Sequence, residues 1–280
     1  MRPTKSALLS VAVVLSVSTM TACTPSPTPD ETLQVLYQDA LHDAEALTGF
    51  SPAVSTLRTE HADEIAEEIR RLCGFTDEGA LPESCELEVP AVAAAPATDA
   101  DHWIADSQVR ILNQLGGLPE ESIPLITEHY IEQARLSPVI DSIDAPDGAI
   151  ILEDEDLAAA QEHLAEEYAA AWALGVALAH VDPAHRVATQ TAIDRHREYA
   201  ALLRTVIEPF AETSPSEPGY DLLNLTDPVD GPTALTMITE VQNHAVDTWH
   251  STASQATDDG WRSLATQLAG ATAKDTVPFS

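Results

Sequence analysis

The chain is poor in positive charge. Only 13 of its 280 residues are lysine or arginine, against 46 aspartates and glutamates, so its formal net charge is −33. Binding to a phosphate backbone needs clustered basic residues, and this sequence has none. We therefore exclude a nucleic-acid partner. The acidity predicts a solvated surface that aids solubility, with the capture of cations or a cationic peptide as the alternative.

An apolar run long enough to cross a bilayer is also missing. Residues 7–17 form an apolar run of about eleven residues, whereas a membrane-spanning helix needs about 20. Arg2 and Lys5 precede this run, and the small residues Thr21 and Ala22 follow it, directly before Cys23. A basic start, a short apolar run and small residues at a cleavage site are typical of a secretory signal.

The residues Met20-Thr21-Ala22-Cys23 resemble the lipobox of bacterial lipoprotein signal peptides. This resemblance implies cleavage before Cys23, diacylglycerol transfer to its thiol and acylation of the new amino group, and two or more such chains anchor a protein stably. We expect a signal peptide at 1–22, a Pro/Ser/Thr tether at 23–29, and a location on the outer face of the cytoplasmic membrane. The alternative is an ordinary secretory signal in which Cys23 is incidental.

Cysteine is scarce, with three in the chain. The two beyond Cys23 are Cys73 and Cys85, and an even pair in an exported protein predicts a disulfide. A metal-binding pair is the alternative, but the sequence contains no second cysteine pair. The short loop that such a disulfide closes would stabilise the fold by roughly 3 kcal/mol in the chain-entropy model.

Strand-like alternation and glycine-rich phosphate loops are absent, and helical periodicity takes their place. We predict an all-α fold in which a long, alanine-rich helix at 154–181 organises the second half. A helical region at 30–148 precedes a bundle at 149–280, as a second small unit or as extra helices on the same bundle. The short first connection makes the first two helices antiparallel. The predicted helices are 30–47, 52–73, 99–115, 119–136, 154–181, 184–210, 231–256 and 259–273.

A diffuse set of residues characterises the second half of the chain. They are Glu167, Tyr168, Trp172, Gly175, Val176, His196, Arg197, Tyr220, Pro228, Val229, Glu240 and Trp249. With these residues the chain resembles the ferritin-like domain of actinobacterial envelope proteins, the DUF4439 type, over about residues 154–273. The resemblance implies an up-and-down four-helix bundle, although this chain has Glu167-Tyr168 where we expect Glu-His in that family.

Four of the bundle residues are candidate metal ligands, namely Glu167, His196, Glu240 and His244. Ferritin-like metal proteins carry Glu-x-x-His on two helices, and no such motif occurs here. At about 1.5 Å of rise per residue, however, Glu167, His196 and His244 lie at the same height of the bundle, where they could hold iron, manganese or zinc.

A structural role for Glu167 is the expectation we favour over a metal site. Arg195 or Arg197 on the next helix would pair with the Glu167 carboxylate and form an ion pair that stabilises the bundle. His61 with Glu64 raises the same question in the first half, and we again expect a packing role.

The sequence contains no recognisable catalytic constellation. Cys73 and Cys85 are expected to be bridged, and no Gly-x-Ser-x-Gly elbow occurs. We therefore expect a non-enzymatic, lipid-anchored helical protein without a cofactor, which binds an envelope protein or acts structurally. The alternative is a metal-binding ferritin-like protein.

Overall fold

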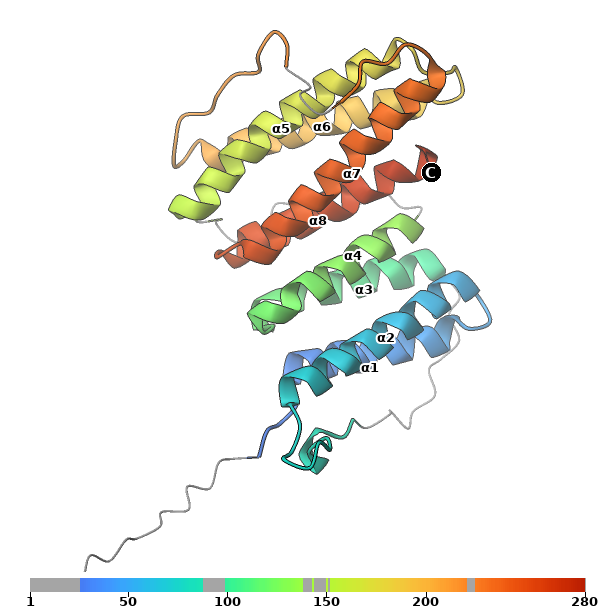
Figure 1. The fold of residues 1–280 in the computed structure, drawn as a ribbon, viewed down its shortest axis with the longest axis vertical. Helices are drawn as coiled ribbons and strands as arrows, with labels where there is room; N and C mark the ends of the chain where they lie inside the picture. The colour runs from blue at the N-terminus through green and yellow to red at the C-terminus, as the bar shows by residue number, and fades with distance from the viewer. Residues whose placement is uncertain are drawn as a thin grey trace, which may run out of the picture.

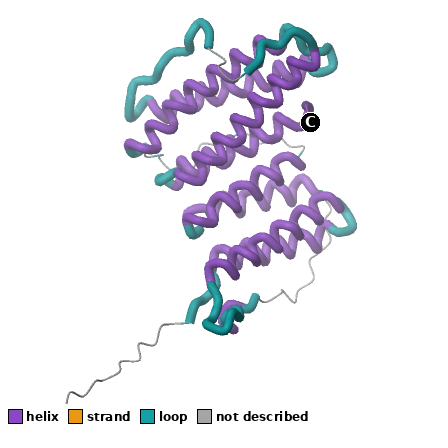
Figure 2. The backbone as a smooth tube through the Cα atoms, viewed as in Figure 1, coloured by secondary structure: helices purple, strands orange, loops and turns teal. Residues whose placement is uncertain are grey.

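The computed structural model describes residues 26–87, 99–137, 143, 150, 152–220 and 225–279. Within these ranges all regular secondary structure is helical and no strand occurs, as Figure 2 shows. The prediction of an all-α fold is therefore confirmed. The expected signal peptide, Cys23 and most of the residues around the expected boundary between 148 and 149 lie outside the described residues.

The α-helices of the described residues lie within a few residues of the predicted ranges. No helix in these ranges combines the length and the apolar character that crossing a membrane requires. The helices are α1 (Glu31–Leu47), α2 (Pro52–Cys73), α3 (Ala100–Gln114), α4 (Ile123–Leu136), α5 (Asp154–Leu178), α6 (Arg186–Ile207), α7 (Gly231–Gln255) and α8 (Asp259–Thr276).

Aspartate side chains mark several helix starts. Asp30 Oδ1 accepts the backbone N–H three residues later at 2.9 Å, and Asp258 Oδ1 does the same at 2.8 Å. Asp230 and Thr233 form a reciprocal capping box at the start of α7. These bonds satisfy N–H groups that have no partner inside the helix. Because the bonds join neighbours in the sequence, the sequence alone located these boundaries.

The helices stack in four antiparallel pairs, which Figure 1 shows from one end of the molecule to the other. The pair α1/α2 forms one end, followed by α3/α4, then α7/α8, and finally α5/α6 at the far end. Chain order and spatial order therefore differ, since α7 and α8 return to lie between α5/α6 and the first half. The second half is a helical bundle, as expected, but α8 packs mainly on α7 and α4 and only slightly on α6.

Helix α4 joins the two halves of the molecule. Its residue Ile131 belongs to the core that Trp249 and Trp261 fill, whereas the neighbouring Tyr130 belongs to the core of α1 and α2. Adjacent faces of one helix, about 100° apart, thus contribute to both cores. Asp156 links α5 to the start of α8. Its carboxylate accepts the backbone N–H of Asp258, the N-cap residue of α8, at 2.9 Å.

A disulfide closes the end of the stack at α1/α2. Cys73, the last residue of α2, bonds Cys85 in the short helix η1 (Glu83–Cys85) with an S–S distance of 2.19 Å. Cys85 is fully buried. The predicted disulfide is therefore confirmed.

The contact between α4 and α8 depends on the missing side chain of Gly270. A Cβ at this position would lie 2.5 Å from Cε1 of Tyr130 and 3.2 Å from the Cβ of Ala134. We expect Gly270→Ala to lower the free energy of unfolding by about 1–3 kcal/mol, because the aromatic ring has to move in a packed core. Urea denaturation followed by circular dichroism measures this change.

Gly175 in α5 is the matched control. It is exposed, and a Cβ there would meet nothing within 4 Å. We expect Gly175→Ala to raise the free energy of unfolding by about 0.5–1 kcal/mol, since alanine is the better helix former. Equal effects of the two substitutions would show that α4 and α8 do not pack as closely as the structure shows.

Candidate functional site

The Glu167 carboxylate is the centre of a buried polar cluster in the second half. Its Oε2 accepts the Nδ1–H of His196 on α6 at 2.6 Å, and its Oε1 accepts the Nε1–H of Trp249 on α7 at 2.9 Å. His196 Nε2 in turn donates to Oε1 of Gln242 at 2.6 Å. All four residues are at most 2% exposed. We call these four residues, which come from three helices, the Glu167 cluster.

The hydrogen bonds of His196 favour its protonated form. Both ring nitrogens face acceptor oxygens, which an imidazolium can satisfy and a neutral ring cannot. Burial by itself lowers the pKa of His196, but the Glu167 carboxylate and the hydrogen bonds to Glu167 and Gln242 raise it more, so the net shift of the pKa is upward. Glu167 and His196 thus form a buried ion pair that joins α5 to α6.

Aromatic rings enclose this ion pair. His163 stacks on Trp249 with ring centroids 3.8 Å apart and planes 8° from parallel, and Trp261 meets Trp249 edge-on at 5.9 Å. His163 Nε2 also lies 2.5 Å from Oγ1 of Thr252. The rings exclude water from the ion pair, and each partner of the pair is already satisfied by protein groups. The arrangement therefore fits a structural role better than ligand binding.

The structure brings together only two of the four predicted metal ligands. Glu167 and His196 meet as the height argument requires, but Glu240 and His244 lie exposed on the surface of α7. The nearest acid to His244 Nε2 is Glu166, at 3.9 Å. The expected meeting of Glu167 with His244 was therefore wrong, and Gln242 takes that place.

His244 does not face Glu167 because side chains turn around the axis of α7. Height along the bundle depends on residue number alone, whereas the direction of a side chain turns by about 100° per residue. His244 is two residues from Gln242, so it points to nearly the opposite side of α7. The apolar pattern of α7 could have shown this, because the buried residues Ile238, Val241 and Ala245 leave position 244 outside.

The expected arginine partner of Glu167 was also wrong. Arg195 pairs with Glu198 at 3.3 Å and lies 4.0 Å from Asp275 on α8, whereas Arg197 pairs with Asp194 at 3.1 Å on the exterior of α6. Neutralisation of Glu167 comes from His196 instead.

A second buried cluster lies between α2 and α4. The rings of His61 and His129 stack with centroids 3.9 Å apart and planes 10° from parallel. His61 Nε2 donates to Glu132 at 2.9 Å, and His129 Nε2 donates to Glu64 at 2.7 Å. Each helix thus carries a His-x-x-Glu sequence whose histidine bonds the glutamate of the other helix. His61 and Glu64 were expected to act together, but their hydrogen-bond partners are Glu132 and His129 on α4.

These two histidines stay neutral. Burial and the charge of Arg58 lower the pKa of His61 to about 3, and burial, His61 and Arg58 hold the pKa of His129 well below 6.5. Arg58 Nη1 donates to His61 Nδ1 at 3.0 Å, which fixes the tautomer with the proton on Nε2. The stacked pair is therefore a fixed hydrogen-bonding unit across the physiological pH range.

Asp43 connects this cluster to the first and third helices. Its carboxylate, 2% exposed, accepts from Arg58 at 3.2 Å and from Arg110 at 2.7 Å and 2.8 Å. Arg110 also reaches the partly exposed Asp39 at 3.2 Å. The charges of α1, α2 and α3 thus compensate one another in the core.

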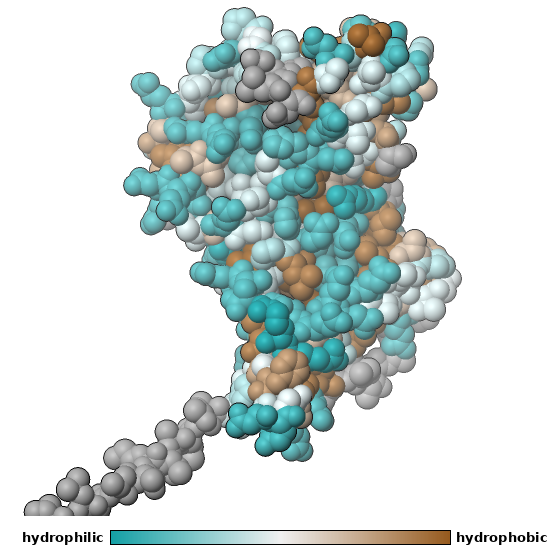
Figure 3. All heavy atoms as spheres, in the orientation of Figure 1, coloured by the Kyte–Doolittle hydropathy of each residue, from teal (hydrophilic) through white to brown (hydrophobic). Residues whose placement is uncertain are grey.

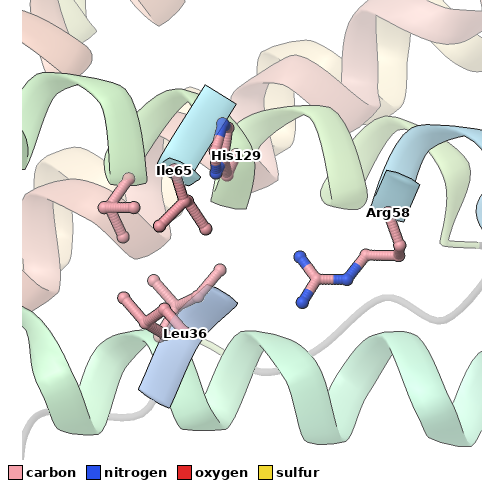
Figure 4. A pocket seen from close by; sticks show the side chains of 6 residues that line it. Leu36, Arg58, Ile65 and His129 are labelled. Atoms are coloured by element: carbon pink, nitrogen blue, oxygen red, sulfur yellow. The ribbon is translucent and has the colours of Figure 1, made fainter. Parts of the chain in front are cut away.

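A small cavity lies beside the arginine. Leu36, Arg58, Ile65 and His129 point toward it from α1, α2 and α4 in Figure 4. Its volume is about 10 Å³, which is room for one water molecule at most. It is too small for a substrate.

An open, acidic hollow of about 490 Å³ lies on the surface between α2 and α4. Burial and the nearby charge of Glu132 raise the pKa of Glu64 at its edge. Arg71 and Glu68 both line the hollow and are joined by two hydrogen bonds of 2.6 Å and 2.7 Å. Within the described residues, no group of three or more histidine, cysteine or acidic side chains has a geometry that could hold a metal ion.

Comparison with known proteins gives a family match in the second half of the chain. No curated protein and no solved structure matches the chain. Residues 159–280 match the family described as Domain of unknown function (DUF4439), and these residues include the whole Glu167 cluster. The lipoprotein character, the actinobacterial origin and the ferritin-like relationship remain predictions. The C-terminal part of the chain therefore matches the DUF4439 family, and the helices α1–α4 precede the matched residues.

Proposed function

We propose that this protein is a lipid-anchored helical module on the outer face of the cytoplasmic membrane, with a binding or structural role and no catalytic activity. The observation that carries this proposal is the closed character of the Glu167 cluster. Glu167 and His196 direct their polar atoms to other buried side chains. His61 and His129 are also buried, and they donate to the partly exposed carboxylates of Glu132 and Glu64. Buried groups of this kind hold helices together and are not exposed to a substrate.

The N-terminal sequence supports the anchor. The residues around Cys23 fit a lipobox, and the run of proline, serine and threonine that follows fits an extended tether. A covalent lipid suits this chain because an acidic protein has no electrostatic attraction to an anionic bilayer.

The surface supports a role in binding rather than catalysis. Hydrophilic residues cover most of the face in Figure 3, with apolar residues in small groups. Val187, Val229 and Val277 are 78%, 76% and 45% exposed and lie where α6 and α7 begin and α8 ends. An envelope protein that docks at this end of the bundle would cover them.

Replacing the anchor residue tests the proposal most directly. We expect Cys23→Ala to move the protein from the detergent-soluble membrane fraction into the medium, because the thiol that carries the lipid is gone. Cell fractionation followed by immunoblotting measures the distribution. A Cys73→Ser variant that retains Cys23 serves as the control and should stay in the membrane fraction. A Cys23→Ala variant that remains membrane-bound would refute the lipid anchor.

Metal analysis tests the non-enzymatic part of the proposal. The alternative, a ferritin-like metal protein, requires iron, manganese or zinc in a fixed ratio to the chain. Elemental analysis of the protein purified without chelators measures this ratio, and a stoichiometric metal would reject the proposal.

A further inference from the structure

The described chain begins beside the disulfide-bonded loop. Ser84 Oγ donates to the carbonyl oxygen of Pro27 at 2.7 Å, and Sγ of the buried Cys85 lies 3.6 Å from the same oxygen. Gln34 Nε2 donates to the carbonyl oxygen of Pro29 at 3.3 Å. The N-terminal segment is therefore held on one side by α1 and on the other by the loop that Cys85 fixes.

This attachment lies at one end of the stack. In Figure 1 the N-terminal segment and the disulfide-bonded loop lie beyond α1/α2, and the pair α5/α6 forms the opposite end. Neighbouring helix layers are about 8–10 Å apart, so three steps separate the first and last layers by roughly 25–30 Å. Cys23 precedes Ser26 by three residues, which span about 10 Å when fully extended. A lipid on Cys23 would thus hold this end of the stack close to the bilayer.

We propose that the end of the stack formed by residues 26–30 and 74–87 is the face that lies against the membrane, and that the loop closed by Cys73–Cys85 sets this orientation by holding Pro27. The inference rests on the proposed lipid anchor and adds to it a membrane-facing surface. The DUF4439 domain then points away from the bilayer, with α5/α6 outermost.

The composition of this face explains why its orientation depends on the hydrogen bond from Ser84 to Pro27, which we call the clamp. Phe75, two residues after Cys73, is 70% exposed and can enter the headgroup region. Four exposed carboxylates on the same loop oppose contact with anionic lipids, so charge does not direct this face to the membrane. They are Asp77, Glu78, Glu83 and Glu86.

Energy transfer on vesicles tests the orientation. With Cys73 and Cys85 bridged, the chain that starts at Cys23 has one free thiol, which can be coupled to maleimide lipids in phosphatidylcholine vesicles. A donor dye is placed through an encoded azide residue at position 78, beside the proposed face, or at position 212, on the loop after α6. With acceptor-labelled lipids, we expect transfer from position 78 to exceed transfer from position 212 at least threefold. Equal transfer, or more from position 212, would overturn the orientation.

The clamp is tested with Ser84→Ala, which removes the bond to Pro27 and leaves the disulfide in place. We expect the difference between the two positions to fall by at least half in this variant and in the double variant Cys73→Ser/Cys85→Ser, in which Cys23 is still the only thiol available for coupling. Ser254→Ala, which removes a serine bond within α7, should leave the difference unchanged. An unchanged difference in Ser84→Ala would overturn the clamp. Because the coupling is chemical, these results do not depend on lipidation in the cell, which Cys23→Ala tests separately.

Discussion

Removing the Glu167 carboxylate should cost more stability than removing any surface acid of the bundle. We expect Glu167→Ala to lower the free energy of unfolding by about 3–5 kcal/mol, because it leaves a buried imidazolium and a buried indole N–H without their acceptor. Trp249 and His196 are both at most 1% exposed, so water cannot replace the lost bonds. Chemical denaturation monitored by tryptophan fluorescence measures the effect.

Glu166 provides the matched control for this substitution. It precedes Glu167 on the same helix, is about one third exposed, and lies 3.2 Å from His163 Nδ1. We expect Glu166→Ala to cost less than about 1 kcal/mol, as is usual for exposed ion pairs. Comparable losses in the two variants would mean that the Glu167 cluster is not the polar centre of the bundle.

The pH dependence of the stability lost in Glu167→Ala tests whether the Glu167–His196 ion pair is the cause. The pKa of His196 is raised above 6.5 in the folded protein, so the ion pair stabilises the fold fully at pH values below 6.5. This contribution disappears as the pH rises through the folded pKa, because His196 is then neutral in both states. The difference in stability between the wild type and Glu167→Ala should therefore be larger below pH 6.5 than in alkaline buffer. A difference that grows with pH would exclude the ion pair as the cause.

Loss of the Asp43 charge should have a similar effect in the first half. We expect Asp43→Asn to lower the free energy of unfolding by about 3–5 kcal/mol, since it leaves the Arg58 guanidinium buried without a carboxylate. Burial already lowers the pKa of Arg58, and Asp43 is the main group that opposes this shift. Thermal and urea denaturation followed by circular dichroism measure the loss.

Asp39→Asn is the control, because Asp39 binds the same Arg110 from a position that is 30% exposed. Its cost should stay below about 1 kcal/mol. If Asp43→Asn costs no more than Asp39→Asn, then the buried network of α1, α2 and α3 contributes little to stability.

Local chemistry explains why the helices could be predicted from the sequence. Aspartate caps such as Asp30 and Asp258, and the apolar periodicity between them, act over three or four residues. The disulfide could also be predicted, because Cys73 and Cys85 are the only cysteines besides Cys23, which is expected to carry the lipid, and a pair has one possible bond. None of these inferences requires knowledge of how distant helices pack.

The partners of the buried charges could not be predicted in the same way. Glu167 meets His196 and Trp249, and His61 meets Glu132, across 29, 82 and 71 positions of the sequence. Equal height placed His196 correctly, but the rotation of α7 about its axis decided that Gln242 and not His244 faces inward. That rotation follows from the packing of whole apolar faces.

The sequence by itself determined the helical class, the helix boundaries, the disulfide and the DUF4439 resemblance of the second half, because each depends on neighbours in the chain or on a short motif. Only the tertiary structure decided that α7 and α8 lie between α5/α6 and α4, that Gly270 leaves room for Tyr130, and that the Glu167 cluster is closed. The physical reason is that burial free energy depends on which faces meet. Many pairings of amphipathic helices satisfy the same periodicity, and close packing selects one of them.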